Sequence, residues 1–179
     1  DFLGKEDIIT PVFERTLRHV LIRQNTVTKL INEAAIDPLT RCISRLYFER
    51  KLSYDFNRSK LNGEPLCVLA IDLDRLKETN DQHGHEAGDL TLGAVGECFQ
   101  KTLRGEDYVG RMGGDEFVAV LPGCDSVRGS EVAERLVESI ANIELPYEDK
   151  VLQPSISVGV AHSVHAITYK DLIKAADNA

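Results

Sequence analysis

The sequence predicts an α/β (α+β) domain in which a mixed, mainly antiparallel sheet is surrounded by helices. Residues 66–74 are apolar until two closing aspartates, which is typical of a central buried strand. Residues 108–110 and 117–121 flank a Gly-Gly turn and predict an antiparallel hairpin. Helical and strand patterns alternate along the rest of the chain. The 179 residues, 42% of them hydrophobic, suffice for one core and an additional helix.

The first predicted element is a long helix over residues 11–35. Its seam positions recur at alternating four- and three-residue steps, which is a heptad pattern. The seam consists of Phe13, Leu17, Val20, Gln24, Val27, Ile31 and Ala34. We therefore expect a coiled-coil dimer in which Gln24 weakens the coil but favours one register. An amphipathic helix that packs on its own domain is the alternative.

The remaining elements follow from turn signals and periodicity. Asp37-Pro38 interrupts the helical pattern, and Asn62-Gly63 marks a turn before the buried strand. Pro122 closes the second strand of the hairpin. In chain order we predict a helix over 45–60, the strand 66–74, a helix over 86–103, the hairpin, a helix over 126–141, a strand over 155–161 and a helix from about Tyr169.

Carboxylates gather at the ends of two predicted strands. Asp72 and Asp74 are two residues apart, so both side chains point to one face unless the strand ends before Asp74. If the hairpin pairs with this strand, its Asp115 joins Asp72. Such a cluster holds Mg²⁺ when substrate phosphates complete the coordination. The alternative is a solvated hairpin tip, in which the glycines supply positive φ and the acids face water.

Charge and composition exclude several classes of function. The formal net charge of −8 argues against a general nucleic-acid surface. No apolar run approaches the roughly 20 residues that span a bilayer, and no secretory signal pattern is visible, so we expect no membrane insertion and a cytoplasmic location. The four cysteines form no C-x-x-C pair and predict small buried side chains in a reducing compartment.

The acidic pair predicts a metal cofactor if the ligand is a nucleoside triphosphate. Two like charges about 4 Å apart repel by around 4 kcal/mol at an effective dielectric constant near 20. A divalent cation must therefore stand between the phosphates and the carboxylates of Asp72 and Asp115. We expect dependence on Mg²⁺ or Mn²⁺ on this ground alone.

Several separate motifs follow one another along the chain. They are Asp37-Pro38-Leu39-Thr40, Asp72-Leu73-Asp74 with Lys77, Asn80-Asp81-Gln82-His83-Gly84-His85-Glu86-Ala87-Gly88-Asp89, Arg104-Gly105-Glu106-Asp107 and Arg111-Met112-Gly113-Gly114-Asp115-Glu116-Phe117. In order and spacing they resemble a GGDEF domain, the catalytic module of diguanylate cyclases, over most of residues 37–179. The resemblance implies the palm-like nucleotidyl-cyclase fold. It also implies a catalytic domain over 37–179 that follows a linker and the end of an upstream region over 1–36.

The two ends of the chain carry weaker signals. Asp1-Phe2-Leu3-Gly4-Lys5 resembles the end of a response-regulator receiver domain, although another sensor or a simple linker remains open. The family pattern continues beyond Ala179 with Tyr-x-Ala-Lys and Gly-Arg-Asn segments, without which weak GTP binding is expected. Ser44-Arg45 stands where the family has Asn-Arg, and we expect only a mild local change there.

The resemblance implies that two GTP molecules condense to cyclic di-GMP (c-di-GMP) with release of pyrophosphate. In a homodimer, the 3′-hydroxyl of one GTP attacks the α-phosphate of the other. By similarity, Asp72 and Asp115 bind the metal ions through side chains and Leu73 through its carbonyl oxygen. Asp115 is also the candidate that orients or deprotonates the 3′-hydroxyl. Glu116, which regular strand geometry turns to the face opposite Asp115, is a candidate for a secondary metal or structural contact.

The resemblance assigns further residues to the nucleotide. Lys77 would stabilise the phosphates as a mobile point charge, and Gly113 and Gly114 would let backbone amides approach them. Asn80 and Asp89 would read the guanine edge. The alternatives are an ordinary exposed lysine, a helix cap at Asn80 and a first-turn helix acid at Asp89.

A second, inhibitory site is implied by Arg104, Asp107 and Arg135, which resemble the family's contacts to dimeric c-di-GMP. The alternative is a weak surface salt bridge at a helix end. Two other functions remain open. One is a catalytically silent receptor for c-di-GMP or GTP, and the other is a coiled-coil scaffold.

Overall fold

The computed structural model describes residues 35–179. The heptad seam and the receiver-like first residues lie outside this part of the chain, so both stay predictions. None of the helices in the described part is long and apolar enough to cross a membrane.

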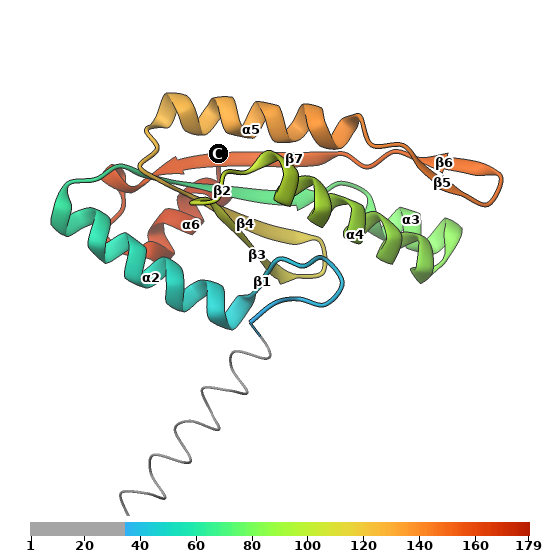
Figure 1. Cartoon of the computed structure of the whole chain (residues 1–179), viewed down its shortest axis with the longest axis horizontal. Coiled ribbons are helices and arrows are strands. Elements are labelled where there is room, and N and C mark those ends of the chain that lie inside the picture. The colour runs from blue at the N-terminus through green and yellow to red at the C-terminus, as the bar shows by residue number, and fades with distance from the viewer. Residues whose placement is uncertain (1–34) are drawn as a thin grey trace, which may run out of the picture. The chain divides into compact units, whose positions relative to one another are not determined.

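A five-stranded sheet forms the centre of the domain. It consists of β1 (Ile43–Ser44), β2 (Leu66–Leu73), β3 (Tyr108–Gly113), β4 (Glu116–Pro122) and β7 (Ile156–His162), in the order β1-β3-β4-β2-β7. The two-residue strand β1 pairs with β3 in parallel, and every other neighbouring pair is antiparallel. The predicted mixed, mainly antiparallel sheet is confirmed, because the hairpin pairs with the buried strand (Figure 1).

Helices cover both faces of this sheet. They are α2 (Arg45–Asn62), α3 (Leu76–His83), α4 (His85–Thr102), α5 (Ser126–Ala141) and α6 (Tyr169–Asp177), with a 3-10 turn, η1 (Ser163–His165). A small hairpin of β5 (Leu145–Tyr147) and β6 (Lys150–Leu152) extends beyond one end of the sheet (Figure 1). The helices predicted within residues 35–179 are confirmed to within two residues of their predicted ends. In contrast, α3, β1 and the β5–β6 hairpin were not predicted.

The alternation of side chains along β2 divides the core into two layers. Cys67, Leu69, Ile71 and Leu73 face a cluster that includes residues of α4 and α5. Leu66 and Val68 face a second cluster that includes residues of α2 and α6. Because β2 is covered on both faces, nearly all of its side chains are apolar. On the α2–α6 face this cover ends before Asp72, whose side chain is exposed, whereas Leu73 is still buried on the opposite face.

Side-chain caps fix the starts of two helices. The Asp125 side chain accepts a hydrogen bond from the backbone amide of Arg128 at the start of α5. Thr168 and Asp171 form a reciprocal capping box at the start of α6. These contacts satisfy backbone amides that lack partners within the helices. They therefore set where α5 and α6 begin against the sheet.

Candidate active site

The end of β2 lies beside the turn of the β3–β4 hairpin. Asp72 is the cross-strand partner of Glu116, so their side chains share one face of the sheet. The backbone amide of Leu73 donates a hydrogen bond to the carbonyl oxygen of Asp115 at 3.1 Å. The turn itself consists of Gly114 and Asp115, and Gly114 has φ +51°, a conformation that favours glycine. The hairpin thus brings two acidic residues to the acidic end of β2.

These acids form an uncompensated negative cluster. Burial raises the pKa of Asp72 above its ordinary value, and the charges of Asp115, Asp74, Glu116 and Asp177 raise it further. Within residues 35–179, no ion pair involves Asp72, Asp115 or Glu116. A divalent cation at this position would relieve the repulsion.

The chemistry of the donors fits a hard divalent cation. The described residues contain no preformed group of three or more His, Cys, Asp or Glu side chains around one metal position. Mg²⁺ is typically bound by one or two carboxylates together with substrate phosphates and water. Asp72, Asp115 and the Leu73 carbonyl could therefore supply the protein ligands, while nucleotide phosphates complete the coordination.

Asp74 lies beyond the end of β2, and its carboxylate oxygens already have partners. The Ser155 hydroxyl donates to Oδ2 at 2.7 Å, and the Ser157 hydroxyl donates to Oδ1 at 2.8 Å. Ser157 is in turn the cross-strand partner of Asp72 on β7. The sequence had not singled out either serine, since nothing in it gives the register between β2 and β7.

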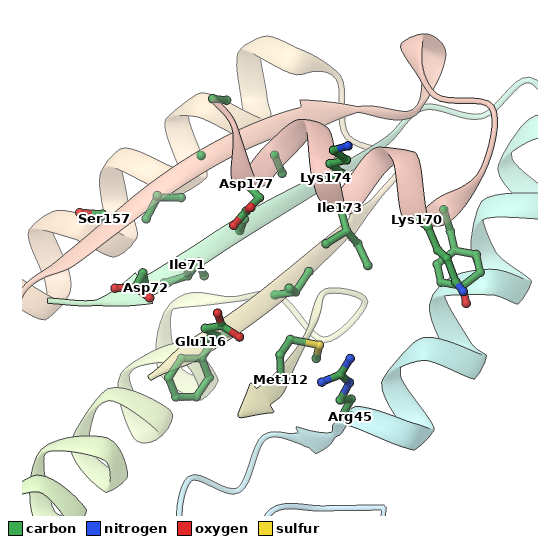
Figure 2. Close-up of a pocket in the computed structure, with 18 of the residues that line it drawn as sticks. Arg45, Ile71, Asp72, Met112, Glu116, Ser157, Lys170, Ile173, Lys174 and Asp177 are labelled. Atoms are coloured by element: carbon green, nitrogen blue, oxygen red, sulfur yellow. The ribbon is translucent and has the colours of Figure 1, made fainter. Parts of the chain in front are cut away.

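A cavity of about 900 Å³ makes the acidic cluster accessible from the α2–α6 face of the sheet. Asp72 and Glu116 line it from neighbouring strands, as Figure 2 shows. Lys170 and Lys174 come from α6, and Arg45 from the start of α2. Ions and small anionic groups can therefore reach the two carboxylates.

The two candidate guanine-reading residues lie on α3 and α4. Asn80 is on α3, and Asp89 is in the second turn of α4. Gly88, buried and adjacent to Asp89, has no Cβ, and a Cβ there would collide with the carboxamide of Asn80. The Asn80 side chain therefore lies against α4 next to the position of Asp89. Lys77, in the first turn of α3, is exposed.

Arg111 connects the hairpin turn to the first residues of the domain. Its guanidinium donates from Nε and Nη2 to the carbonyl oxygen of Gly114 at 3.1 and 2.8 Å, and from Nη1 to Asp37 Oδ1 at 3.2 Å. Asp37 also accepts from the amide and hydroxyl of Thr40. Burial by itself raises the pKa of Asp37, but the Thr40 hydrogen bonds and Arg111 outweigh it and lower that pKa. The sequence motifs contained these residues without indicating their contact.

The candidate inhibitory-site residues come from the loop before β3 and from α5. The backbone amide of Arg104 donates to Asp107 Oδ2 at 3.0 Å. Arg135 of α5 donates from Nη2 to the carbonyl oxygen of Thr102 at 3.4 Å, two residues before Arg104. The guanidinium of Arg135 thus lies at the base of the loop that carries Arg104 and Asp107, and both arginines are exposed.

Comparison with known proteins identifies the family. The model of the family described as "Diguanylate cyclase, GGDEF domain" matches residues 34–179. Diguanylate cyclase DosC of Escherichia coli K12 is 34% identical over 182 residues, which cover 92% of this chain and 39% of that protein. Diguanylate cyclase A of Treponema denticola is 31% identical over 156 residues, which cover 85% of this chain and 42% of that protein. The chain thus spans about two fifths of these curated relatives.

Solved structures agree with the sequence match. A sensory box/GGDEF family protein from Caulobacter crescentus has a TM-score of 0.75 and 36% identity, covering 82% of this chain and 95% of that chain. The coiled coil and GGDEF domain of DgcB from the same organism, solved in complex with c-di-GMP, has a TM-score of 0.79 over 96% of this chain and 91% of that one. At 19% identity, this second likeness supports the fold alone. The chain belongs to the GGDEF family of diguanylate cyclase domains.

Proposed function

We propose that this chain contains a diguanylate cyclase domain that condenses two GTP molecules to c-di-GMP and pyrophosphate. The observation that carries the proposal is the convergence of Asp72 with the acidic hairpin turn. Relatives named diguanylate cyclases support the same class.

In the proposed mechanism, Asp72 and Asp115 hold Mg²⁺ or Mn²⁺ with the Leu73 carbonyl oxygen. When bound, the ions stabilise charge on the attacking, equatorial and leaving oxygens. Asp115 orients the attacking 3′-hydroxyl or accepts its proton. Glu116 shares the face of Asp72 and supplies a further metal or structural contact.

We assign nucleotide binding to residues of α3 and α4 and to the glycines of the hairpin. Lys77 neutralises charge on the phosphates, and the backbone of Gly113 and Gly114 approaches them at the hairpin turn. A Cβ at either glycine position would meet no atom within 4 Å, so the turn is open to a ligand. Asn80 and Asp89 bind the guanine edge, which has donor groups that adenine lacks.

The reaction requires two such sites to face each other. One domain provides one guanine site and one set of metal-binding carboxylates, whereas the product contains two GMP units. We therefore propose an active homodimer that assembles through residues 1–36, with a cytoplasmic location. Arg104, Asp107 and Arg135 form the proposed inhibitory site for the product.

Incubation of the protein with GTP and Mg²⁺ tests the proposed reaction. We expect c-di-GMP and pyrophosphate from the wild type and from Asp149→Asn, a control at an exposed turn. We expect no product from Asp115→Ala. Binding of c-di-GMP or GTP without turnover would instead support a receptor, and absence of both binding and turnover would support a scaffold.

Product inhibition has its own test. Arg104→Ala should keep its initial rate and lose inhibition by added c-di-GMP, because it lacks one guanidinium of the inhibitory site. Arg128→Ala is the matched control, since Arg128 is an exposed arginine of α5. Equal inhibition of Arg104→Ala and wild type would remove the feedback part of the proposal.

A further inference from the structure

The two-residue turn between β2 and α3 joins the metal-binding and nucleotide-binding parts of the proposed site. Asp72 and Leu73 precede the turn, and Lys77 and Asn80 follow it on α3. The turn residue Arg75 has φ +57° and ψ +24°, which is the left-handed region. For a residue with a side chain this conformation is uncommon and persists where the surrounding structure holds it.

Asp74, the other turn residue, makes three hydrogen bonds to Ser155, which directly precedes β7, and to Ser157 of β7. Its backbone amide donates to the carbonyl oxygen of Ser155 at 2.9 Å. Its two carboxylate oxygens accept from the hydroxyls of Ser155 and Ser157 at 2.7 and 2.8 Å. Bonds from hydroxyls to a carboxylate are short and about twice as strong as bonds between neutral groups.

Leu73, the residue before Asp74, forms a hydrogen bond to the other side of the sheet. The Leu73 amide donates to the Asp115 carbonyl oxygen in the hairpin turn. Consecutive residues therefore connect the end of β2 to β7 on one side and to the hairpin on the other, because β2 lies between β4 and β7. A substitution of Asp74 would therefore shift the metal-binding residues before the turn relative to the nucleotide-binding residues after it.

The contacts of Asp74 favour a positioning role over direct metal binding. Each carboxylate oxygen already accepts a serine hydroxyl, and these two bonds orient the Asp74 side chain toward Ser155 and Ser157. Asp72, in contrast, accepts no hydrogen bond from another side chain within the described residues. The two aspartates of the Asp72-Leu73-Asp74 motif therefore have different roles, metal binding for Asp72 and positioning for Asp74.

We propose that Asp74 is a positioning residue which, through Ser155 and Ser157, holds the β2–α3 turn so that Asp72, Leu73, Lys77 and Asn80 meet one GTP. The inference rests on the proposed diguanylate cyclase function. It adds to that function two serines of the β7 region and a residue that contacts neither metal nor nucleotide.

The test compares Asp74→Ala, Asp74→Asn and the double variant Ser155→Ala/Ser157→Ala with wild type. Asp149→Asn and Ser130→Ala are matched controls, because both residues are exposed. For each protein, two measurements are made with excess Mg²⁺. The first gives kcat and KM for GTP, and the second gives the affinity for a non-hydrolysable GTP analogue. Thermal unfolding identifies a temperature at which every variant is folded, and all measurements are made there.

We expect kcat of Asp74→Ala to fall on the order of 100-fold in the folded protein, since a misplacement of about 1 Å has that effect. The double serine variant should lose a similar factor. Combining Asp74→Ala with Ser155→Ala/Ser157→Ala should lower kcat no further than either set alone, because the three residues act as one hydrogen-bonded unit. Asp74→Asn should retain about tenfold more activity than Asp74→Ala, because its amide oxygen still accepts a hydroxyl. Wild-type kcat and KM in folded Asp74→Ala or in the double serine variant would overturn the proposal.

Binding of the analogue separates this inference from the proposed reaction. If wild type forms no c-di-GMP, the proposed function fails, and the comparison of affinities still tests Asp74. An affinity about tenfold or more below wild type in both Asp74→Ala and the double serine variant supports positioning. Equal affinities in the folded proteins contradict it.

Discussion

Replacement of Gly88 by alanine should displace Asn80, one of the two residues proposed to bind guanine, without changing the identity of Asn80 or Asp89. Gly88 is buried in the first turn of α4, and the Cβ of an alanine there would collide with the carboxamide of Asn80. The colliding atoms are at the end of a flexible side chain, so Asn80 should rotate while the backbone stays in place. The variant therefore tests whether the position of the Asn80 side chain matters while the residue itself is retained.

The size of the effect follows from the hydrogen bonds that Asn80 would lose. An amide makes one or two neutral bonds to the guanine edge, which together contribute about 1–3 kcal/mol. GTP affinity should accordingly fall about 5- to 150-fold. Stability should not fall with it, because alanine is favoured over glycine within a helix by up to about 1 kcal/mol.

Two other glycines of α4 provide controls. A Cβ at Gly93 would lie 3.7 Å from the Leu39 carbonyl oxygen, an ordinary contact, so Gly93→Ala should leave GTP affinity unchanged and should not lower the unfolding midpoint. A Cβ at Gly96 would collide with the backbone of Thr40, so Gly96→Ala should lower the unfolding midpoint. Titration calorimetry with GTP and thermal unfolding of all three variants complete the comparison.

The reasoning fails if folded Gly88→Ala binds GTP as tightly as Gly93→Ala. In that case Asn80 either does not contact the base or is not displaced. A crystal structure of the variant distinguishes these two causes. Discrimination between GTP and ATP should also decrease in Gly88→Ala, because adenine makes no use of the lost contact.

Three further substitutions test single side-chain contacts and charges. Tyr108→Phe removes a 2.8 Å hydrogen bond to buried Asp55 and should lower the free energy of unfolding by about 1.5–3 kcal/mol in urea titrations, and no change would contradict the importance of that bond. The pKa of Asp37 is lowered, so its stabilising contribution is present above its ordinary pKa of 3.8 and is lost as the pH falls through the lowered value. Asp37→Asn should therefore be less stable than wild type at pH 7, with the gap closing in strong acid, whereas a gap independent of pH would exclude the ion pair with Arg111 as its cause. The pKa of Asp72 is raised, so its charge opposes folding above that pKa. Asp72→Asn should raise the unfolding midpoint without metal at pH 7 and lose the stabilisation by Mg²⁺ and GTP, and a lower midpoint would contradict the repulsion.

Periodicity and turn residues were sufficient to predict most of the fold. The helix α5 begins and ends at the predicted residues, 126 and 141, because its apolar face is regular and Asp125 caps it. The helix α3 was missed because Leu76 is its single buried residue, so no apolar repeat marks it. The strand β1 has two residues, too few for a period-two pattern, and is defined by its pairing with β3 and by the bridge between Ile43 and Ile36.

Some parts of the candidate site could likewise be predicted from the sequence, and others could not. The acids stand out in the sequence because Asp72 and Asp74 end one apolar strand, whereas Asp115 and Glu116 come directly before another. The partners of Asp74 and Arg111 do not, because Ser155 and Asp37 are 81 and 74 residues away along the chain. Such contacts depend on the register and order of the strands, which local sequence patterns do not contain.

The separation of Asn80 and Asp89 from the acidic residues has a consequence for how this domain can evolve. The first pair lies on α3 and α4, whereas Asp72 and Asp115 lie at the end of β2 and in the hairpin turn. Under the proposed roles, one mutation in the hairpin would abolish turnover while selective recognition of the purine survives. A gene duplicate could thereby become a sensor of cellular guanine nucleotide in a single step, with its fold retained.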